Sequence, residues 1–568
     1  MKKTASLSDL ARLLGFRPKA LSFLLYKLPD NSKYTTFKIP KKSGGEREIN
    51  APDPRLKGLQ KRLANLLQNC FEEIYGRERY NHSLSHAFRK DHSIITNARA
   101  HKNKRYVFNI DLIDFFPSIN FGRVRGYFIK NTDFGLHPNV ATVIAQIVCY
   151  NNELPQGSPT SPVLSNLIGH ILDVRLVILA KKTKCQYSRY ADDITFSTRE
   201  KQFPSTIATQ DDAGCWHPSS KLLCIIRKSG FEVNHNKTTM QHHAYRQVTT
   251  GLVVNRKVNI KASYYRQARA MCSSLFKTGA FYIGTEVRKG RSASISGKDL
   301  GSINVLRGVL SHIYNVKRLN DKRDQKERWG KPTAIHKLYE KFVLFEKFHN
   351  LRKPLIFCEG KTDSVYLKCA LYSLASEYPD LIQVSNGEVN YAIDFFKHSK
   401  SNQDLLQFSG GTGDSRYLIK DYNKKMKPFL CKGKRFPVII LVDSDQGSKK
   451  VFSAAKEVIG NNENVTGDED FYYITQNLYL IALPKINNVS SVAIEDFFEK
   501  SVRETKIDGK SLAKSNESDN RKYYSKHIFA EKVIRPNKGK INFERFKGIL
   551  DRILKVIQDY ESRRETKS

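Results

Sequence analysis

The sequence is that of a basic, globular protein with several domains. It has 568 residues, of which 96 are Lys or Arg and 56 are Asp or Glu, so the formal net charge is +40. This length predicts roughly two to four domains, and 40% hydrophobic with 11% aromatic residues excludes a wholly disordered chain. Because a cationic surface binds polyanions by releasing their counterions, the charge indicates a nucleic-acid partner.

The targeting and cysteine patterns favour a cytoplasmic protein. The start, MKKTASLSDLARLLG, lacks the apolar segment of a secretory signal because Asp9 and Arg12 interrupt it. The nine cysteines form no C-x-x-C pair, so we expect neither a zinc ribbon nor a disulfide framework. No apolar run approaches the roughly 18 residues of a membrane span, so no membrane partner is expected.

Changes in composition along the chain predict where domains end. The first 260 residues combine basic helices with α+β segments, and basic helices are expected to follow. After Lys353-Pro354, strands and helices alternate, which is typical of an α/β domain with a mainly parallel sheet. We expect four parts: 1–260, 261–350, 351–500 and a charged C-terminal extension, 501–568.

A first group of acidic residues predicts a metal site. Residues 106–111 are β-prone and would deliver Asp111 at a strand end, where its carboxylate can project into a cleft. Two further β-prone segments flank Ala191-Asp192-Asp193, which predicts a hairpin with adjacent carboxylates at its tip. Like charges repel at a tight turn unless a cation binds there, and Mg²⁺ prefers oxygen ligands. The alternative is an ordinary Asp-Asp turn, which is common.

The strings around these acids resemble the motifs of reverse transcriptases. Asp111-x-x-x-Phe-Phe and Tyr190-Ala-Asp-Asp193 are similar to motifs A and C, and LPQGSPTSP with Leu164-Ser-Asn166 is similar to motif B. GFEVNHNKT from residue 230 resembles motif D, and KKSGGEREI at 41–49 resembles the fingers turn. Five motifs in the order of the family outweigh the ordinary-turn alternative. The resemblance implies an α+β right-hand polymerase with fingers and palm to 260 and a thumb to 350.

The resemblance implies a role for each matching residue. Asp111 and Asp192 would bridge two Mg²⁺ ions, which activate the attacking hydroxyl and stabilise the leaving pyrophosphate, and Asp193 would orient the site. Phe116 would be the steric gate against a ribonucleotide 2′-OH, with a core aromatic as the alternative. Arg47, and less clearly Lys42, would contact the triphosphate unless they belong to a solvated basic turn. The remaining expected substrate contacts are Gln156, Gly157 and Lys237.

Two further strings resemble signatures of retron reverse transcriptases. Asn97-Ala-Arg-Ala-His101 is similar to their Asn-Ala-x-x-His signature, although His101 could be a surface histidine. Thr250-Gly251 is similar to their Val-Thr-Gly segment, with Thr249 in place of the valine. The resemblance implies that Asn97, His101, Thr250 and Gly251 bind a structured noncoding RNA in a bacterial cytoplasm. Synthesis from deoxynucleoside triphosphates would start at a guanosine 2′-OH and give branched RNA-linked single-stranded DNA (msDNA).

A second group of acids follows strands of the α/β part. Glu359 comes directly after the β-prone run Leu355–Cys358, and Asp443-Ser-Asp445 follows the run Pro437–Val442. Carboxyl ends of parallel strands meet at one sheet edge, and residues two apart on an extended chain face the same way. The three carboxylates can therefore share one ion. The alternative is an ordinary α/β domain with acidic loop ends.

A Glu-Gly after one strand with Asp-x-Asp after a later one resembles the Toprim domain. This resemblance implies metal-dependent phosphodiester cleavage with Mg²⁺ or Mn²⁺ held by Glu359, Asp443 and Asp445. Glu495 and Lys526 resemble accessory elements of the nuclease-type Toprim branch, the overcoming-lysogenisation-defect nucleases, although each could be a plain surface residue. Topoisomerase activity is not expected, because the chain leaves little room for a DNA-gate domain.

Together the resemblances imply a retron polymerase fused to a Toprim nuclease. The nuclease would be an effector of antiphage defence by abortive infection, held in check by the DNA–RNA product. One alternative is a reverse transcriptase ribonucleoprotein whose Toprim region only binds or processes nucleic acid. The nucleic-acid substrate of the Toprim site, DNA or RNA, and the oligomeric state, a homo-oligomer included, are left open by the sequence.

Overall fold

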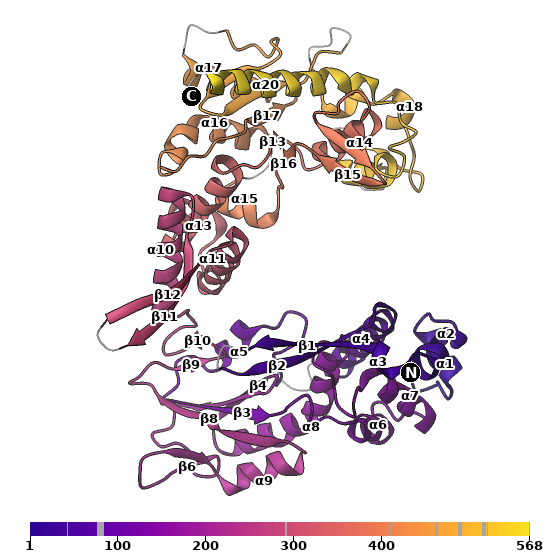
Figure 1. The fold of residues 1–568 in the computed structure, drawn as a ribbon, viewed down its shortest axis with the longest axis vertical. Coiled ribbons are helices and arrows are strands. Elements are labelled where there is room, and N and C mark those ends of the chain that lie inside the picture. Colours follow the sequence, from indigo (N-terminus) through magenta and orange to yellow (C-terminus); the bar gives the residue numbers. More distant parts are fainter. Residues whose placement is uncertain are drawn as a thin grey trace. The chain divides into compact units, whose positions relative to one another are not determined.

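The chain divides by its contacts into two compact units. The computed structural model (Figure 1) describes residues 1–566 apart from 42–43, 76–83, 290–291, 409–410, 461–463, 487–490, 514–518 and 520. The first unit is Met1–Ala262 with Val316–Asn320, and the second contains the remaining residues. Residues 263–315, predicted as part of the thumb or connection, belong by their contacts to the second unit. The domain boundary predicted at 350 does not coincide with this division.

An antiparallel sheet with the strand order β4-β5-β3-β8 forms the centre of the first unit. The predicted hairpin is confirmed, since Tyr190 pairs with Asp193 and only Ala191 and Asp192 connect the strands. Ala191 has a φ of 57°, as a tight two-residue turn requires. The strands are β3 (Tyr106–Ile113), β4 (Gln186–Tyr190), β5 (Asp193–Thr198) and β8 (Glu232–His242).

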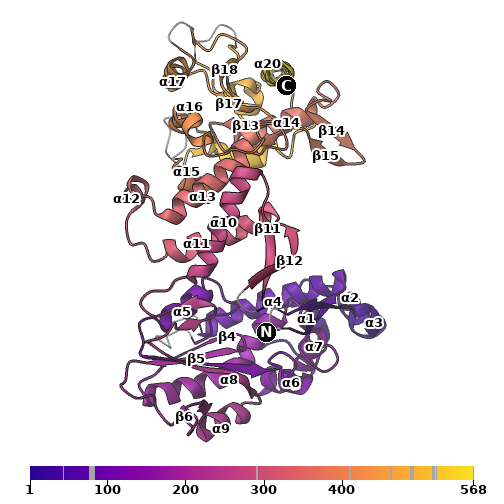
Figure 2. The same cartoon turned by 60° about the vertical axis from the view of Figure 1, so that its left-hand side comes forward.

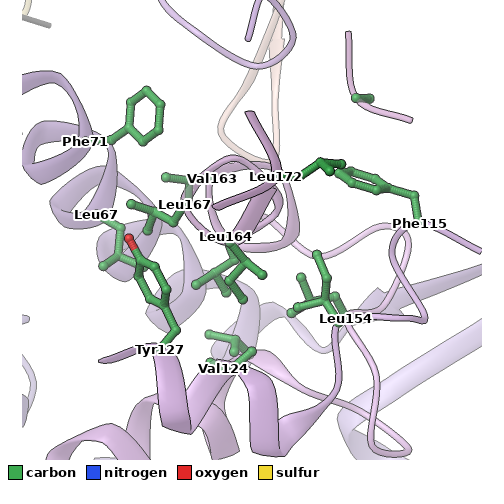
Figure 3. Close-up of a cluster of buried hydrophobic side chains, with 14 of the residues drawn as sticks. Leu67, Phe71, Phe115, Val124, Tyr127, Leu154, Val163, Leu164, Leu167 and Leu172 are labelled. Carbon is green, nitrogen blue, oxygen red and sulfur yellow. The ribbon is translucent and has the colours of Figure 1, made fainter. Parts of the chain in front are cut away.

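Helix α8 (Ser161–Lys182) forms much of the core of this unit. Figure 3 shows Leu164 and Leu167 of α8 in one apolar cluster with residues of α4 (Pro54–Tyr75) and α6 (Phe121–Lys130). The prediction that no apolar run approaches the length of a membrane span is wrong for α8, which among the described residues is the one helix long and apolar enough to cross a membrane by length and composition. Because 67% of its most apolar window is buried here, we assign α8 to the core.

The segment that resembles the fingers turn connects the two strands of a β-hairpin. Strands β1 (Tyr34–Pro40) and β2 (Glu46–Pro52) pair antiparallel, with Ile39 opposite Arg47. The remaining elements of the first unit are α1 (Leu7–Leu13), α2 (Pro18–Ser22), η1 (Phe23–Lys27), α3 (Asp30–Lys33), α5 (Ile94–Ala100), α7 (Pro138–Val148), β6 (Ala208–Gln210), β7 (Trp216–Pro218), α9 (Ser220–Lys228), β9 (Val248–Thr249) and β10 (Leu252–Val253).

The segment between the two sheets is helical with one exception that the sequence analysis missed. A β-hairpin lies where only basic helices were expected, because Ile283, Thr285 and Val287 alternate along the chain and β-branched residues favour strands. The elements of this segment are α10 (Ala262–Thr278), β11 (Tyr282–Lys289), β12 (Ser292–Leu300), α11 (Ile303–Arg318), α12 (Gln325–Gly330), α13 (Ala334–Leu344) and η2 (Phe345–His349).

A mixed five-stranded sheet with the order β16-β13-β17-β19-β18 lies in the second unit (Figure 2). The first four strands run parallel, and β18 at the edge pairs antiparallel with β19. The two strands predicted before the acidic residues are confirmed, and every residue in them is buried. The strands are β13 (Leu355–Cys358), β16 (Asp394–Phe395), β17 (Val438–Val442), β18 (Tyr472–Thr475) and β19 (Leu478–Ala482).

Helices cover this sheet as the sequence predicts. Helix α14 (Asp363–Ser373) begins after Thr362, and its apolar residues Leu367, Ala370 and Leu371 are fully buried. The other elements are β14 (Ile382–Ser385), β15 (Glu388–Tyr391), α15 (Lys400–Leu406), α16 (Thr412–Met426), α17 (Lys449–Ile459), η3 (Ile494–Phe497), α18 (Lys500–Arg503), β20 (Ser511–Leu512), β21 (Tyr523–Tyr524), α19 (Lys526–Ile528), η4 (Phe529–Ile534), η5 (Glu544–Phe546) and α20 (Lys547–Glu565).

Candidate functional site

The antiparallel register of the first sheet brings the predicted acids together. Asp111 on β3 is paired with Asp193 on β5. The backbone N–H of Leu112 donates to the carbonyl oxygen of Asp192 at 3.0 Å, so the tip of the hairpin lies against the end of β3. Asp111 therefore shares one end of the sheet with Asp192 and Asp193, which lie about 80 residues later in the sequence.

The electrostatics of this cluster indicate that it is costly without a cation. Burial raises the pKa of Asp192, and the charge of Asp111 raises it further. Burial raises the pKa of Asp193 to about 7, with the charges of Asp192 and Asp111 adding to the effect. The neighbouring carboxylates thus make ionisation of Asp192 and Asp193 harder, which a divalent cation would reverse.

Lys237 from the motif D string contacts the cluster. Its Nζ lies 3.0 Å from Oδ1 of Asp111, and Nδ2 of Asn234 lies 3.4 Å from the same oxygen. In the part of the chain that the structure describes, no three His, Cys, Asp or Glu side chains already converge as a ligand set. The donors nevertheless fit Mg²⁺, because Asp111, Asp192 and Asp193 offer only carboxylate oxygens. A metal ion at Asp111 would compete with the ammonium group of Lys237.

A cavity of about 900 Å³ opens over the cluster. Asp111 and Asp192 line it together with Arg47, Gln156 and Phe116, so the structure brings most of the predicted polymerase residues to one cavity. Its size lies in the range of small-molecule sites. Lys42, the second candidate for the triphosphate, lies outside the described residues.

The motif B loop is fixed to the fingers hairpin. The backbone N–H of Asn50 donates to the carbonyl oxygen of Gln156 at 2.8 Å. Gly157 has a φ of 120°, and a Cβ there would lie 2.8 Å from the carbonyl oxygen of Asn50. The position therefore requires glycine, which allows the loop to approach β2 closely.

Phe116 and Phe115 differ in their surroundings. Phe115 is 3% exposed and belongs to the core, whereas Phe116 is only partly buried and lines the cavity. Sequence analysis missed a third aromatic, Phe88, which also lines the cavity and whose ring centroid lies 6.3 Å from that of Phe116. Phe88 has a φ of 58° although it is bulky, a strain that is characteristic of functional sites.

Neither Asn97 nor His101 is accessible to RNA in this structure, since both side chains are fully buried. Nδ1 of His101 lies 2.7 Å from Oγ of Ser197, and Nε2 lies 2.6 Å from Oγ of Ser188. The hydroxyl of Ser188 also donates to Oδ1 of Asn97. The surface-histidine alternative is thus wrong, and the two side chains attach α5 to β4 and β5.

The Thr250-Gly251 turn lies beside the start of α5. Oγ1 of Thr250 donates to the carbonyl oxygen of Ile94 at 3.2 Å, while Gly251 is exposed with a φ of 82°. Thr249 is fully buried, and within the described structure its Oγ1 has no hydrogen-bond partner. An apolar residue would suit that position, which agrees with the valine that the family has there.

A second acidic cluster lies at the carboxyl ends of β13 and β17. Burial raises the pKa of Asp443 to about 8, and the charges of Asp363, Glu359 and Glu495 raise it further. The carboxylate of Asp445 forms a local hydrogen bond instead. Its Oδ1 accepts the backbone N–H of Ser448 at 2.9 Å. Glu359, which was predicted to lie near Asp443, therefore acts on it together with Glu495, which the sequence analysis treated as an accessory residue.

Glu495 and Lys526 form an ion pair in this cluster. Nζ of Lys526 lies 2.8 Å from Oε2 of Glu495, whose side chain is 9% exposed. Oε1 of Glu495 is buried, and among the described residues it has no hydrogen-bond partner. Glu495 is therefore not a surface acid. A buried carboxylate oxygen without a partner beside Asp443 fits a divalent cation such as Mg²⁺ or Mn²⁺.

Sequence analysis did not identify Asp363 as a member of this cluster. Asp363 is 8% exposed, and its Oδ2 accepts the backbone N–H of Gly360 at 2.7 Å. A Cβ at Gly360 would lie 2.6 Å from Oδ1 of Asp363, so the glycine after Glu359 makes room for this carboxylate.

The chain is similar to known proteins over part of its length. The family model described as reverse transcriptase (RNA-dependent DNA polymerase) matches residues 39–275. The chain is 33% identical over 274 residues to the retron Mx162 reverse transcriptase and 34% identical over 257 residues to the retron Mx65 reverse transcriptase, both from Myxococcus xanthus. These alignments cover 44% and 42% of this chain, and 53% and 55% of the relatives. The chain thus spans about half the length of both.

A further relative is covered almost completely. The retron Ec86 reverse transcriptase of Escherichia coli is 31% identical over 340 residues, which is 59% of this chain and 90% of the relative. A solved telomerase from Candida albicans aligns over 69% of this chain and 65% of its own at 11% identity, with a TM-score of 0.31 that carries no argument about the fold.

Proposed function

We propose a function from the premise that this chain belongs to the retron reverse transcriptases. The first unit is an RNA-directed DNA polymerase that copies a cognate structured noncoding RNA into msDNA. The observation that carries this proposal is the pairing of Asp111 with Asp193, which gathers three carboxylates beneath a cavity that Arg47 and Gln156 also line. Deoxynucleoside triphosphates are the second substrate.

The residues of this unit have separate tasks in the proposed reaction. Asp111 and Asp192 would hold Mg²⁺, which supplies an activated attacking hydroxyl and stabilises the leaving pyrophosphate. Arg47 lines the cavity, and its positive charge favours the ionised form of Asp192. From there it would contact the triphosphate. The hydrogen bond from Asn50 to Gln156 holds the loop that would pack against the nascent base pair.

The RNA partner and the priming step rest on the retron family. Synthesis would begin at the 2′-OH of a guanosine in the cognate RNA and leave the DNA joined to it. Thr250 and Gly251 are the proposed RNA contacts, because Gly251 is exposed, whereas Asn97 and His101 would act by holding α5 in place.

The second acidic cluster is proposed to be a Toprim-type metal-dependent nuclease. Glu359, Asp443 and Asp445 would hold Mg²⁺ or Mn²⁺, and Lys526 with Glu495 would complete the site. The raised pKa of Asp443 and the unpartnered oxygen of Glu495 support a cation there. As an effector, the nuclease would act in antiphage defence by abortive infection and be restrained by the DNA–RNA product.

The polymerase proposal is tested by primer extension on an RNA template. Asp192→Asn should reduce extension by several orders of magnitude while leaving RNA binding unchanged, because it removes a metal ligand and no RNA contact. Asp212→Asn, at an exposed position of the same unit, is the matched control and should extend normally. Normal extension by Asp192→Asn would reject the assignment.

A further inference from the structure

A basic and aromatic surface lies beside the second acidic cluster. Its parts come from α14, β15, β16 and the segment after η4. All of its side chains are exposed or half-buried. We call it the α14 face and define it by Lys368, Tyr372, Tyr391, Phe395, Lys397 and Lys538.

Contacts join these residues into one surface. Nζ of Lys538 lies 3.6 Å from the ring centroid of Tyr372. Nζ of Lys368 lies 5.1 Å from the ring centroid of Phe395 and 6.0 Å from that of Tyr391. The hydroxyl of Tyr391 donates to the carbonyl oxygen of Lys368 at 3.4 Å. Lysines therefore alternate with aromatic rings across the α14 face.

The lysines of the α14 face outnumber the acid beside them, Asp394 on β16. Within the described part of the chain, no acidic side chain forms an ion pair with Lys368, Lys397 or Lys538. Burial lowers the pKa of Lys368, and the charges of Lys397 and Arg535 lower it further, although Asp394 acts in the opposite direction. Crowded like charges are costly, and a polyanion that neutralises them would remove that cost.

The α14 face continues to the acidic cluster. Strand β16 pairs parallel with β13, so Phe395 lies beside Ile356, two residues before Cys358. Nε2 of His398 lies 2.8 Å from the carbonyl oxygen of Cys358, which directly precedes Glu359. The edge strand therefore leads from the lysines and rings of the α14 face to the first acid of the cluster.

We infer that the α14 face binds a single nucleic-acid strand and guides it to Glu359 and Asp443. This inference rests on the nuclease function proposed above and names how that site holds its substrate. Phosphates contact Lys368, Lys397 and Lys538, and bases stack on the exposed parts of Tyr372 and Tyr391. Rings interspersed with cations are the usual means of binding single strands without sequence preference.

Photocrosslinking tests this inference in the full-length protein. A single-stranded DNA that carries 4-thiothymidine is bound to the Glu359→Ala variant, in which cleavage is prevented, and the mixture is irradiated. The crosslinked peptides are then identified by mass spectrometry. Crosslinks are expected in the peptides that contain Tyr372 or Tyr391. Adding Lys368→Glu and Lys538→Glu should reduce their yield on the order of tenfold, because two phosphate contacts are lost.

A matched control and two competing outcomes make the test decisive. Lys456→Glu changes an exposed lysine on α17, which both ribbon views (Figures 1 and 2) place away from α14, and it should leave the yield unchanged. Equal crosslinking after the Lys368 and Lys538 changes would overturn the inference, as would preferential competition by duplex DNA. Tyr372→Leu, which keeps all charges, should also lower the yield.

The inference and the proposed nuclease can fail separately. Crosslinks at Tyr372 or Tyr391 without any cleavage by the protein that retains Glu359 would reject the nuclease and keep the binding surface. Cleavage that depends on Glu359 but gives no crosslinks at these peptides would reject the α14 face alone.

Discussion

Arg189 and Asp173 form a fully buried, bidentate ion pair next to the proposed polymerase centre. Nε and Nη2 of Arg189 each lie 2.7 Å from a carboxylate oxygen of Asp173, and the side chains are 0% and 1% exposed. Nη1 of Arg189 donates to the carbonyl oxygen of Ala191 at 3.0 Å, directly before Asp192. A Cβ at Gly169 would lie 2.7 Å from Nη2, so a glycine on α8 admits the guanidinium. The ion pair therefore fixes the backbone at the tip of the hairpin that carries Asp192.

Removing one partner of this pair should destabilise the first unit strongly. Arg189→Met leaves the Asp173 carboxylate buried without its cation, which costs about 3–5 kcal/mol of unfolding free energy. Urea unfolding is followed by the fluorescence of Trp216 in a Trp329→Phe background, because the chain has two tryptophans. Arg189→Lys, which keeps the charge, should lose less. A loss below about 1 kcal/mol in Arg189→Met would contradict the structural role of the pair.

His101 should make the stability of the first unit depend on pH. Burial, and then the charges of His86 and Lys104, lower the pKa of His101 from 6.5 to about 3. The unfolded chain takes up a proton below pH 6.5 that the folded chain accepts only near pH 3. The free energy of unfolding therefore falls as the pH drops through this window, by at most about 1.4 kcal/mol per pH unit from this group.

The variant His101→Gln lacks this titration, so its stability should fall less steeply than that of the wild type between pH 6.5 and 5. Urea unfolding at several pH values measures both slopes. His235→Gln, which removes an exposed histidine, shows the effect of losing a histidine as such. Identical slopes for His101→Gln and the wild type would show that His101 is not held neutral in the interior.

Phe116→Ala should relax discrimination against ribonucleotides. The side chain lines the cavity that would receive the sugar, and shortening it opens space for a 2′-OH. We expect the preference for deoxynucleotides, measured as a ratio of kcat/KM values, to fall about tenfold or more. Phe115→Ala should instead cost about 3–5 kcal/mol of stability, because Phe115 belongs to the core. An unchanged ratio in Phe116→Ala would place that residue among the structural aromatics.

Glu359→Ala should separate the two proposed activities. It should preserve msDNA synthesis, which depends on the first unit, and abolish the toxicity that follows release of the effector. The readouts are the msDNA yield on gels and the growth of cells that express the protein without its RNA. Lys361→Ala, at an exposed position two residues along, is the matched control. Retained toxicity in Glu359→Ala would place the effector chemistry elsewhere.

The sequence predicts those strands and turns that are determined by residues next to one another in the chain. The strand before Asp111, the hairpin at Asp192 and the buried strand before Asp443 follow from apolar runs that end in polar residues, and all are confirmed. The burial of His101 could not be predicted, because its partners Ser188 and Ser197 lie on two other strands. Asp363 was likewise missed, since its proximity to Asp443 depends on how α14 follows β13.

The central claim is that the chain makes DNA joined to its own RNA. The most direct measurement is to purify the wild-type protein and the Asp192→Asn variant and to sequence the nucleic acids that accompany each. The wild type is predicted to carry a structured RNA covalently joined to single-stranded DNA, and the variant the same RNA without DNA. RNA free of attached DNA in the wild type, or the same DNA in both proteins, would contradict the account.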